Sequence, residues 1–175
     1  MGDKFDPTKV FEIGDIALWE SKLSRFAEHE PGKHDGKIVL HHMRAMQAEL
    51  LDVVDREGVE SRHLRAVITF GVRAATEQVS PEDTPETKRD AYLYEVEASL
   101  AAQYRIVGEA TDDQIRDFVA FNCVHNVWPF WRYHVFDALK RASLPVPAIP
   151  FFAGRSLPDS GGDNKHVEQS DTEYF

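Results

Sequence analysis

Two stretches in the middle of the chain alternate between apolar and polar residues. In residues 63–75 the apolar positions are Leu64, Ala66, Ile68, Phe70, Val72 and Ala74. In residues 91–106 they are Tyr92, Tyr94, Val96, Ala98, Leu100, Ala102, Tyr104 and Ile106. A period of two is typical of antiparallel strands that bury one face. The pattern therefore predicts two strands, the second with Leu93, Glu95 and Glu97 on the face opposite its tyrosines.

Residues 111–152 instead carry apolar side chains at the spacing of an α-helix. Thr111 and Gln114 are placed to form a capping box at its start, and Pro145 marks its end. The aromatic residues near its middle point in almost all directions around the helix, so one sheet cannot bury them all. Packing inside one chain is one explanation. The one we favour is an oligomer interface made by Trp128, Phe130, Trp131 and Tyr133.

Two earlier stretches are less regular. Residues 11–26 are typical of a first strand with mixed alternation. Residues 38–55 fit two structures, because their composition favours a helix, whereas as a strand they would place Arg44, Met46, Ala48 and Leu50 on one face. Local propensity alone favours the helix. Strands followed by one long helix predict an α+β fold, with an antiparallel sheet and the helix across its apolar face.

The ends of the chain differ in character from the middle. Residues 1–10 are polar and acidic, and residues 153–175 are rich in Gly, Ser and acidic residues and poor in branched apolar ones. Such composition cannot bury enough apolar surface to offset the entropy of ordering. We therefore expect an N-terminal tail over 1–10, one domain over 11–152 and a disordered acidic tail over 153–175.

The net charge of −10 argues against a nucleic-acid partner, whose phosphates need a basic surface. It is compatible with docking to a basic protein surface. The chain has no apolar run long enough for a membrane span, lacks the apolar core of a secretory signal, and contains the single cysteine Cys123. These features predict a cytoplasmic protein without membrane insertion.

Catalytic chemistry finds little support in the sequence. The eight histidines show no metal-ligand spacing, since His41 and His42 are adjacent, and His125 and His134 are nine residues apart. We find neither a phosphate-binding glycine loop nor a nucleophile motif. The expectation is a protein that is not an enzyme and uses no metal or cofactor. The alternatives are a structural subunit of a larger complex or a small-molecule-binding α+β domain, whose pocket would use His63, Tyr104 or His125.

Several motifs together resemble the SecB-type protein-export chaperone family. The helix contains the run WPFWR over 128–132, which is followed by KRASLP over 140–145 and IPFF over 149–152. The starts of the first and last strands, FEI over 11–13 and YLYEV over 92–96, are also similar to that family. The resemblance covers about two-thirds of the chain. It implies a four-stranded antiparallel sheet with 38–55 as its second strand, a long helix packed on it, and a homotetramer assembled as a dimer of dimers.

The resemblance also implies a function. Proteins of this family are ATP-independent holdases that bind unfolded preproteins in apolar grooves and deliver them to the translocase motor ATPase. The matching client-binding positions here are Met43, Met46, Leu50, Val146, Ile149, Phe151 and Phe152. Methionines suit promiscuous binding, because their side chains adapt to varied partners.

Two partners follow from the same resemblance. Translocase docking would use an acidic outer sheet face, whose matching residues are Glu20, Leu93 and Glu95. Divergent relatives instead protect an aggregation-prone antitoxin of a toxin–antitoxin system, and this chain could belong to that branch.

Overall fold

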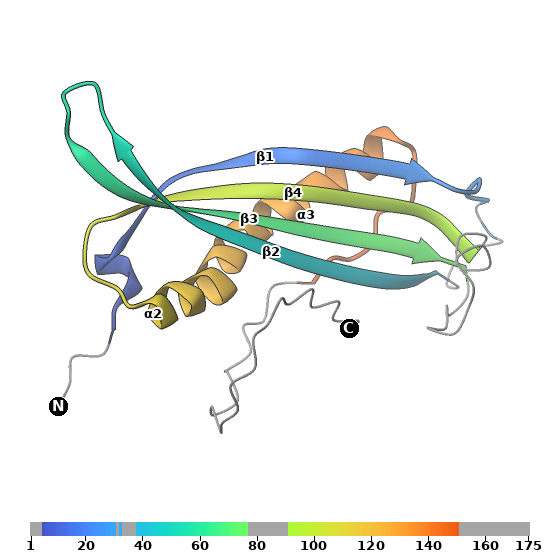
Figure 1. The fold of residues 1–175 in the computed structure, drawn as a ribbon. Coiled ribbons are helices and arrows are strands. Elements are labelled where there is room, and N and C mark those ends of the chain that lie inside the picture. Colours follow the sequence, from blue (N-terminus) through green and yellow to red (C-terminus); the bar gives the residue numbers. More distant parts are fainter. Residues whose placement is uncertain (1–4, 31, 33–37, 77–90, 151–175) are drawn as a thin grey trace.

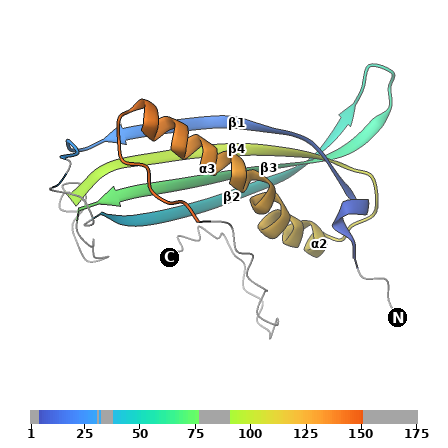
Figure 2. The ribbon, with the colours of Figure 1, turned by 180° about the vertical axis from the view of Figure 1, so that it is seen from behind.

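The computed structural model describes residues 5–30, 32, 38–76 and 91–150, and they form two layers (Figure 1). One layer is a four-stranded antiparallel sheet of β1 (Phe11–Arg25), β2 (Val39–Val54), β3 (Glu60–Ala75) and β4 (Tyr92–Ile106). Its strand order is β1-β4-β3-β2, so β1 and β2 are the edges. The second layer is a helical segment that crosses one face of the sheet (Figure 2). We call the covered face the inner face and the opposite one the outer face. The α+β fold predicted from the sequence is therefore confirmed.

The two central strands follow the alternation seen in the sequence. Each of the six predicted apolar positions of β3, from Leu64 to Ala74, is buried, and so are the inner-face residues of β4 from Tyr94 to Tyr104. Both strands have a neighbour on either side, and the helical layer covers their inner face. Hydrophobic burial therefore concentrates on β3 and β4.

Residues 38–55 form an edge strand, so the helix favoured by local propensity is wrong and the strand implied by the family resemblance is right. β2 pairs with β3 without interruption, from Val39 opposite Ala75 to Val54 opposite Glu60. Pairing with a neighbouring strand overrides a helical preference that amounts to only a few tenths of a kcal/mol per residue. The register places Arg44, Met46, Ala48 and Leu50 on the inner face, opposite buried residues of β3.

A register shift at the start of β4 changes one part of the sequence prediction. Ala74 pairs with Tyr94 but Ala75 pairs with Tyr92, so Leu93 is the extra residue of a bulge. Consequently Tyr92 lies on the outer face, where its ring packs 5.7 Å from the guanidinium carbon of Arg73. The predicted common face for Tyr92 and Tyr94 is therefore wrong, because the bulge reverses the alternation at that point.

The helical layer consists of α2 (Asp112–Asp117), the π-helix η2 (Phe118–Cys123) and α3 (Val124–Arg141). Thr111 and Gln114 form the predicted capping box. Buried residues recur every four positions at 119, 123, 127, 131, 135 and 139. In an α-helix each such step turns the stripe by about 40°. A π-turn holds more residues per turn, which offsets part of that rotation and keeps the stripe on the sheet.

The helix covers the centre of the sheet and leaves its edges open. Among strands, it contacts β4 and β3 most extensively. On the inner face of β1, Ile13 and Leu18 are 55% and 50% exposed, and on β2 Met46 and Leu50 are 36% and 37% exposed. The two edge strands therefore present apolar side chains that the described residues do not cover fully.

Candidate functional site

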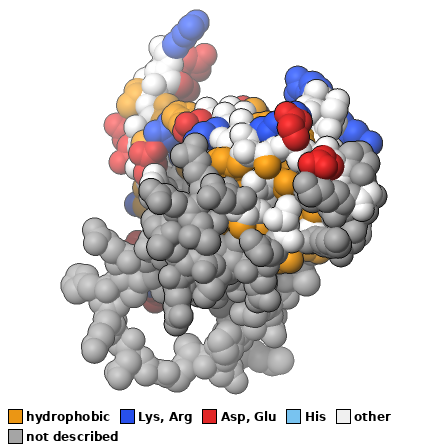
Figure 3. Space-filling view, turned by 90° about the vertical axis from the view of Figure 1, so that its right-hand side faces the viewer, with side chains coloured by type: hydrophobic (Ala, Val, Ile, Leu, Met, Phe, Trp, Pro, Cys, Tyr) orange, Lys and Arg blue, Asp and Glu red, His pale blue; other side chains and the backbone are white. Residues whose placement is uncertain are grey.

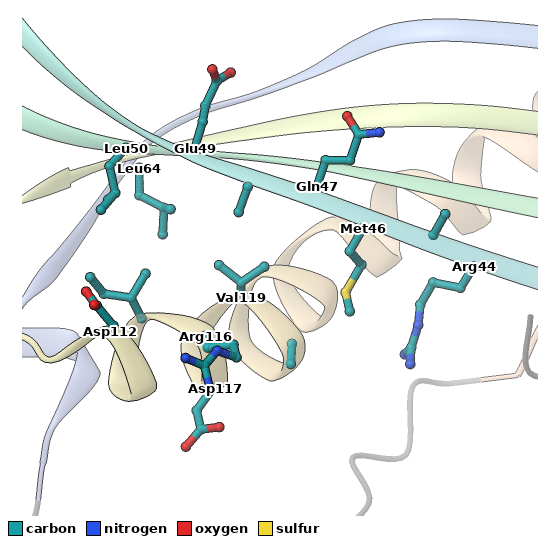
Figure 4. A pocket seen from close by; sticks show the side chains of 14 residues that line it. Arg44, Met46, Gln47, Glu49, Leu50, Leu64, Asp112, Arg116, Asp117 and Val119 are labelled. Carbon is teal, nitrogen blue, oxygen red and sulfur yellow. The ribbon is translucent and has the colours of Figure 1, made fainter. Parts of the chain in front are cut away.

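An open groove lies between edge strand β2 and the start of the helical layer (Figure 4). Its volume is about 710 Å³. The apolar side chains in it come from three elements. They are Met46, Ala48 and Leu50 of β2, Leu64 of β3, and Ile115, Val119 and Ala120 of the helical segment. We call this site the β2 groove.

The β2 groove has charges at its ends and along its helical rim. Arg44 lies at one end, whereas Asp112 lies at the other, near Leu50 (Figure 4). Arg116 and Asp117 lie along the helical rim, and Arg116 forms an ion pair with Asp113 at 3.0 Å. Among the described residues no group of histidine, cysteine and carboxylate side chains could hold a metal. Between these charges the groove offers the apolar side chains of β2, β3 and the helical segment.

The predicted client-binding residues separate into different places. Met46 and Leu50 line the β2 groove. Met43 lies on the outer face, because it pairs with Gly71, which lies between the inner-face residues Phe70 and Val72. Its side chain occupies the space where a Cβ on Gly71 would sit. The prediction for Met43 is therefore corrected: it does not join Met46 in one groove.

The other predicted client-binding residues follow the helix. Val146 and Ile149 line a second groove of about 450 Å³ with Arg132 and Phe136 of α3. Ile149 is itself buried, so little of its side chain is available to a client. Phe151 and Phe152 lie outside the described residues.

Three side-chain donors hold the segment 144–150 against the helix and the sheet. Trp128 Nε1 donates to the Pro150 carbonyl at 2.9 Å, and Arg132 Nε donates to the Ile149 carbonyl at 3.1 Å. The hydroxyl of Tyr94 donates to the Pro145 carbonyl at 2.8 Å. Two of these donors belong to the WPFWR run, so that run positions the chain after the helix.

The predicted interface aromatics of α3 fall into two groups. Trp131 is 1% exposed and stacks on Phe70, and Trp128 packs edge-on against the same ring. Trp131 therefore belongs to the core of the single chain, because the buried stripe of α3 passes through it, and it has no surface left for another subunit. Phe130, Tyr133 and Phe136 are exposed on the side of α3 away from the sheet, with Tyr133 at 71%. Of the predicted interface residues, Phe130 and Tyr133 are therefore the exposed ones.

The outer sheet face does not form a purely acidic surface. Arg73 Nε donates to Glu95 at 2.6 Å, Arg105 pairs with Glu12 at 2.6 Å, and Arg65 pairs with Glu49 at 2.5 Å. Arg65 also packs over Trp19, 5.5 Å from its ring centroid. In the end view of Figure 3, both acidic and basic side chains are visible on the part of the molecule that is not grey.

The predicted docking residues are not alike in exposure. Glu20 is exposed on the outer face of β1, where it pairs with Ser99. Glu95 is half-buried in its ion pair with Arg73. Leu93 is 1% exposed, because the bulge takes it out of the alternating outer-face series. That part of the docking prediction is therefore corrected, and Glu20 keeps the position the sequence suggested.

The residues named for a small-molecule pocket do not meet. Tyr104 is buried on the inner face and accepts a hydrogen bond from Asn126 Nδ2 at 3.0 Å, whereas His63 lies on the outer face beside Ser61. His125 is exposed on α3. Burial raises the pKa of the Cys123 thiol, next to Tyr104, to about 12, so this cysteine is an unreactive core residue. The described residues therefore do not bring His63, Tyr104 and His125 into one polar pocket.

The architecture is that of SecB-like chaperones: a four-stranded antiparallel sheet with one long helix across it. Among solved structures it is similar to the SecB-like chaperone Rv1957 of Mycobacterium tuberculosis, determined in complex with a ChAD peptide from the antitoxin HigA1 (Rv1956). The two share a TM-score of 0.55 and 15% sequence identity, over 85% of this chain and 95% of the other. No protein-family model matches this chain, and no curated protein matches it in sequence. The likeness shows the fold.

Sequence reasoning missed several residues of the β2 groove. Arg44 and Ala48 would have been found by preferring the strand over the helix for 38–55, since the strand places them beside Met46 and Leu50. Ile115 and Val119 are part of the apolar stripe of the helix. Nothing in a single sequence says that the stripe's first turns face an edge strand rather than the sheet centre.

Proposed function

We propose that this protein is an ATP-independent molecular chaperone that binds extended apolar segments of unfolded proteins. The observation that carries the proposal is the β2 groove, an open apolar channel beside an edge strand in a SecB-like fold. Apolar burial in such a channel stabilises a bound chain without a sequence code. On this proposal the protein is not an enzyme, needs no cofactor, acts in the cytoplasm, and assembles as a homotetramer through Phe130 and Tyr133. No helix among the described residues is long and apolar enough to cross a membrane.

The test is suppression of aggregation. A chemically unfolded client is diluted into buffer without nucleotide, and light scattering is followed with and without the protein. We expect scattering to fall in proportion to the chaperone added. Met46→Glu places a charge in the β2 groove and should abolish most of the effect, whereas Val53→Glu, at a similarly exposed position outside the groove, should not. Unchanged client aggregation in the presence of the wild-type protein would count against the proposal.

Two kinds of downstream partner remain open on this proposal. One is the translocase motor ATPase, which would receive preproteins for export. The other is an antitoxin, for which the protein would be a dedicated chaperone. Two observations favour the antitoxin. The similar solved chain was determined with an antitoxin peptide, and the outer-face acid Glu95 is engaged by Arg73 rather than free for a basic motor surface.

Co-expression separates the two partners. A toxin–antitoxin gene pair beside the gene for this chain would supply the candidate antitoxin. Its half-life in cells should rise several-fold with the chaperone present and return to its basal value with Met46→Glu. Slower secretion of a preprotein in cells lacking the chaperone, without any change in antitoxin lifetime, would support the export role instead.

A further inference from the structure

The chain leaves the described residues beside one end of the β2 groove. Trp128 Nε1 donates to the Pro150 carbonyl at 2.9 Å, and the Trp128 ring packs against Phe70, with 5.2 Å between the ring centroids. Phe70 in turn pairs with Arg44, the residue at that end of the groove. Figure 2 shows the segment before Pro150 running back from the end of α3 toward the β2 side of the sheet. Residues 151–175 therefore start close to the groove.

Arg44 gives that end of the groove an unmatched positive charge. Its side chain is half-buried, and within the described part of the chain it has no carboxylate partner. A half-buried guanidinium without a partner loses hydration and gains no ion pair in return, so it favours an arriving carboxylate. Met46, the next inner-face residue of β2, adds an exposed apolar side chain beside it. This end of the groove therefore suits a segment with an acidic and an apolar residue two positions apart.

The sequence outside the described residues contains such a pair. Residues 167–175, which we call the acidic segment, read VEQSDTEYF and include no lysine or arginine. Glu173 and Phe175 are about 7 Å apart in extended form, which is also the separation of Arg44 and Met46 along β2. The acidic segment can thus place a carboxylate on Arg44 and an aromatic ring on the Met46 thioether. Sulfur and aromatic rings attract each other.

The linker has a suitable length for this contact. Residues 151–166 join Pro150 to the acidic segment. As a coil, a chain of about 16 residues has an end-to-end distance of about 22 Å, close to the roughly 20 Å that residues 44–50 span in extended form. A linker that matches its span gives an effective concentration in the millimolar range, so even a weak contact fills the groove for much of the time.

We propose that the acidic segment occupies the Arg44 end of the β2 groove as an internal competitor that a client must displace. The regulatory part of this inference rests on the proposed chaperone function, because a competitor regulates client binding only where clients bind. Apparent client affinity falls with the fraction of grooves that are open. Weakly apolar segments are therefore excluded, and strongly apolar ones still bind.

Nuclear magnetic resonance of the methionine methyl groups tests the contact in the full chain. The chain has three methionines, Met1, Met43 and Met46, so the labelled methyl signals are few. A nitroxide is attached to the variant Ser170→Cys. The native Cys123 does not compete for the label, because it is buried and burial raises the pKa of its thiol to about 12.

We expect the nitroxide to broaden the methyl signal of Met46 several-fold more than that of Met43. Met43 is the matched control, since it belongs to the same strand but lies on the outer face. Paramagnetic broadening falls with the sixth power of distance, so it separates the two faces of the sheet. Equal broadening of both signals would overturn the proposal, and so would the absence of broadening.

A charge variant tests the ion pair. Arg44→Gln removes the proposed partner of Glu173 and should reduce the broadening of the Met46 signal several-fold. Arg56→Gln changes an exposed arginine in the turn between β2 and β3, and should leave the broadening as in the wild type. Full broadening in Arg44→Gln would show that the acidic segment is not held by Arg44, contrary to the proposal.

Loss of the competitor should raise affinity for an external segment. The probe is a fluorescently labelled peptide of alternating leucine and serine, and fluorescence anisotropy with the full-length protein gives its dissociation constant. Phe175→Ser should lower this constant about two- to fivefold, because more grooves are open. Leu157→Ser, an apolar position in the linker, is the control and should leave the constant unchanged. An unchanged or higher constant for Phe175→Ser would overturn the competition.

These outcomes separate the internal contact from the chaperone function. Selective broadening of the Met46 signal together with undiminished client aggregation keeps the contact and removes the function. Suppressed client aggregation without selective broadening keeps the function and removes the competitor.

Discussion

The central strands and the edge strands of this sheet use similar residues for different purposes. On β3 and β4 the apolar face is sealed by the helix, and Phe70 lies between Trp128 and Trp131. On β1 and β2 the same face keeps Leu18 and Leu50 partly in solvent. One helix is too narrow to cover a four-stranded sheet. The centre therefore provides most of the stability of the fold, and the edge strands keep apolar side chains that the described residues leave partly exposed.

The largest expected difference between the two regions is in unfolding free energy. Phe70→Ala removes a buried ring that contacts two tryptophans and should cost about 3–5 kcal/mol. Leu18→Ala, at a half-exposed edge position, should cost less than about 1 kcal/mol. Urea unfolding at an unchanged m-value measures both. Similar losses of unfolding free energy in the two variants would show that the edge strands also contribute to the hydrophobic core.

A smaller effect is expected where the segment 144–150 joins the central region. Trp128→Phe keeps an aromatic ring beside Phe70 but removes the Nε1 donor to the Pro150 carbonyl. The loss should be about 1 kcal/mol, with faster amide hydrogen exchange in 144–150. Tyr133→Phe, which deletes a polar atom from an exposed aromatic of the same helix, is the control and should leave exchange unchanged.

Acid should weaken the β2 edge through its histidines. Burial, and secondarily the neighbouring His41, lowers the pKa of His42 below its ordinary value. Burial, and secondarily Arg73, likewise lowers the pKa of His41. A histidine whose folded pKa is lowered contributes fully above its unfolded pKa near 6.5, and that contribution is lost as the pH falls through this range.

His42→Gln should therefore flatten the decline in urea midpoint as the pH falls below about 6.5. His125→Gln, on the exposed side of α3, should leave it as in the wild type. A decline that is identical in all three proteins would assign the pH dependence to other groups.

The smallest effect on stability is expected on the exposed side of α3. Tyr133→Ser should change the unfolding free energy of the single chain by no more than about 0.5 kcal/mol. If the α3 helices of different subunits pack together, the same variant should shift the oligomer toward smaller species, as measured by sedimentation. Val59→Ser, an exposed apolar position at the β2–β3 turn, is the control. A mass unaffected by Tyr133→Ser places the subunit contact elsewhere.

Sequence alone predicted the sealed region better than the open one. Alternation in β3 and β4 is strong because each strand has a neighbour on both sides and an inner face covered by the helical layer. On β3, for example, every inner-face residue from Leu64 to Ala74 is buried. β2 has a neighbouring strand on one side only, and its sequence contains many residues that favour a helix. Local propensity therefore predicted the wrong structure for it. The bulge at Leu93 and the π-helix at 118–123 each depend on a register that only tertiary contacts define.

The candidate site was predicted in part for the same reason. Met46 and Leu50 line the β2 groove, whereas Met43, which the family resemblance grouped with them, lies on the outer face. Strand geometry separates 43 from the other two. The aromatic run of α3 shows the same division, since Trp131 and Tyr133 are two positions apart and face opposite ways.

Arg44 has a consequence beyond the groove. An exposed apolar edge strand is a template on which copies of a chain can polymerise into fibres, and natural sheets block this with a charge that points inward from the edge. Arg44 is such a charge, set on the inner face of β2 between His42 and Met46. Strands that offer the guanidinium no acidic partner are disfavoured at this edge. An inward-pointing charge at this position is therefore expected to limit edge-to-edge association while leaving the edge open.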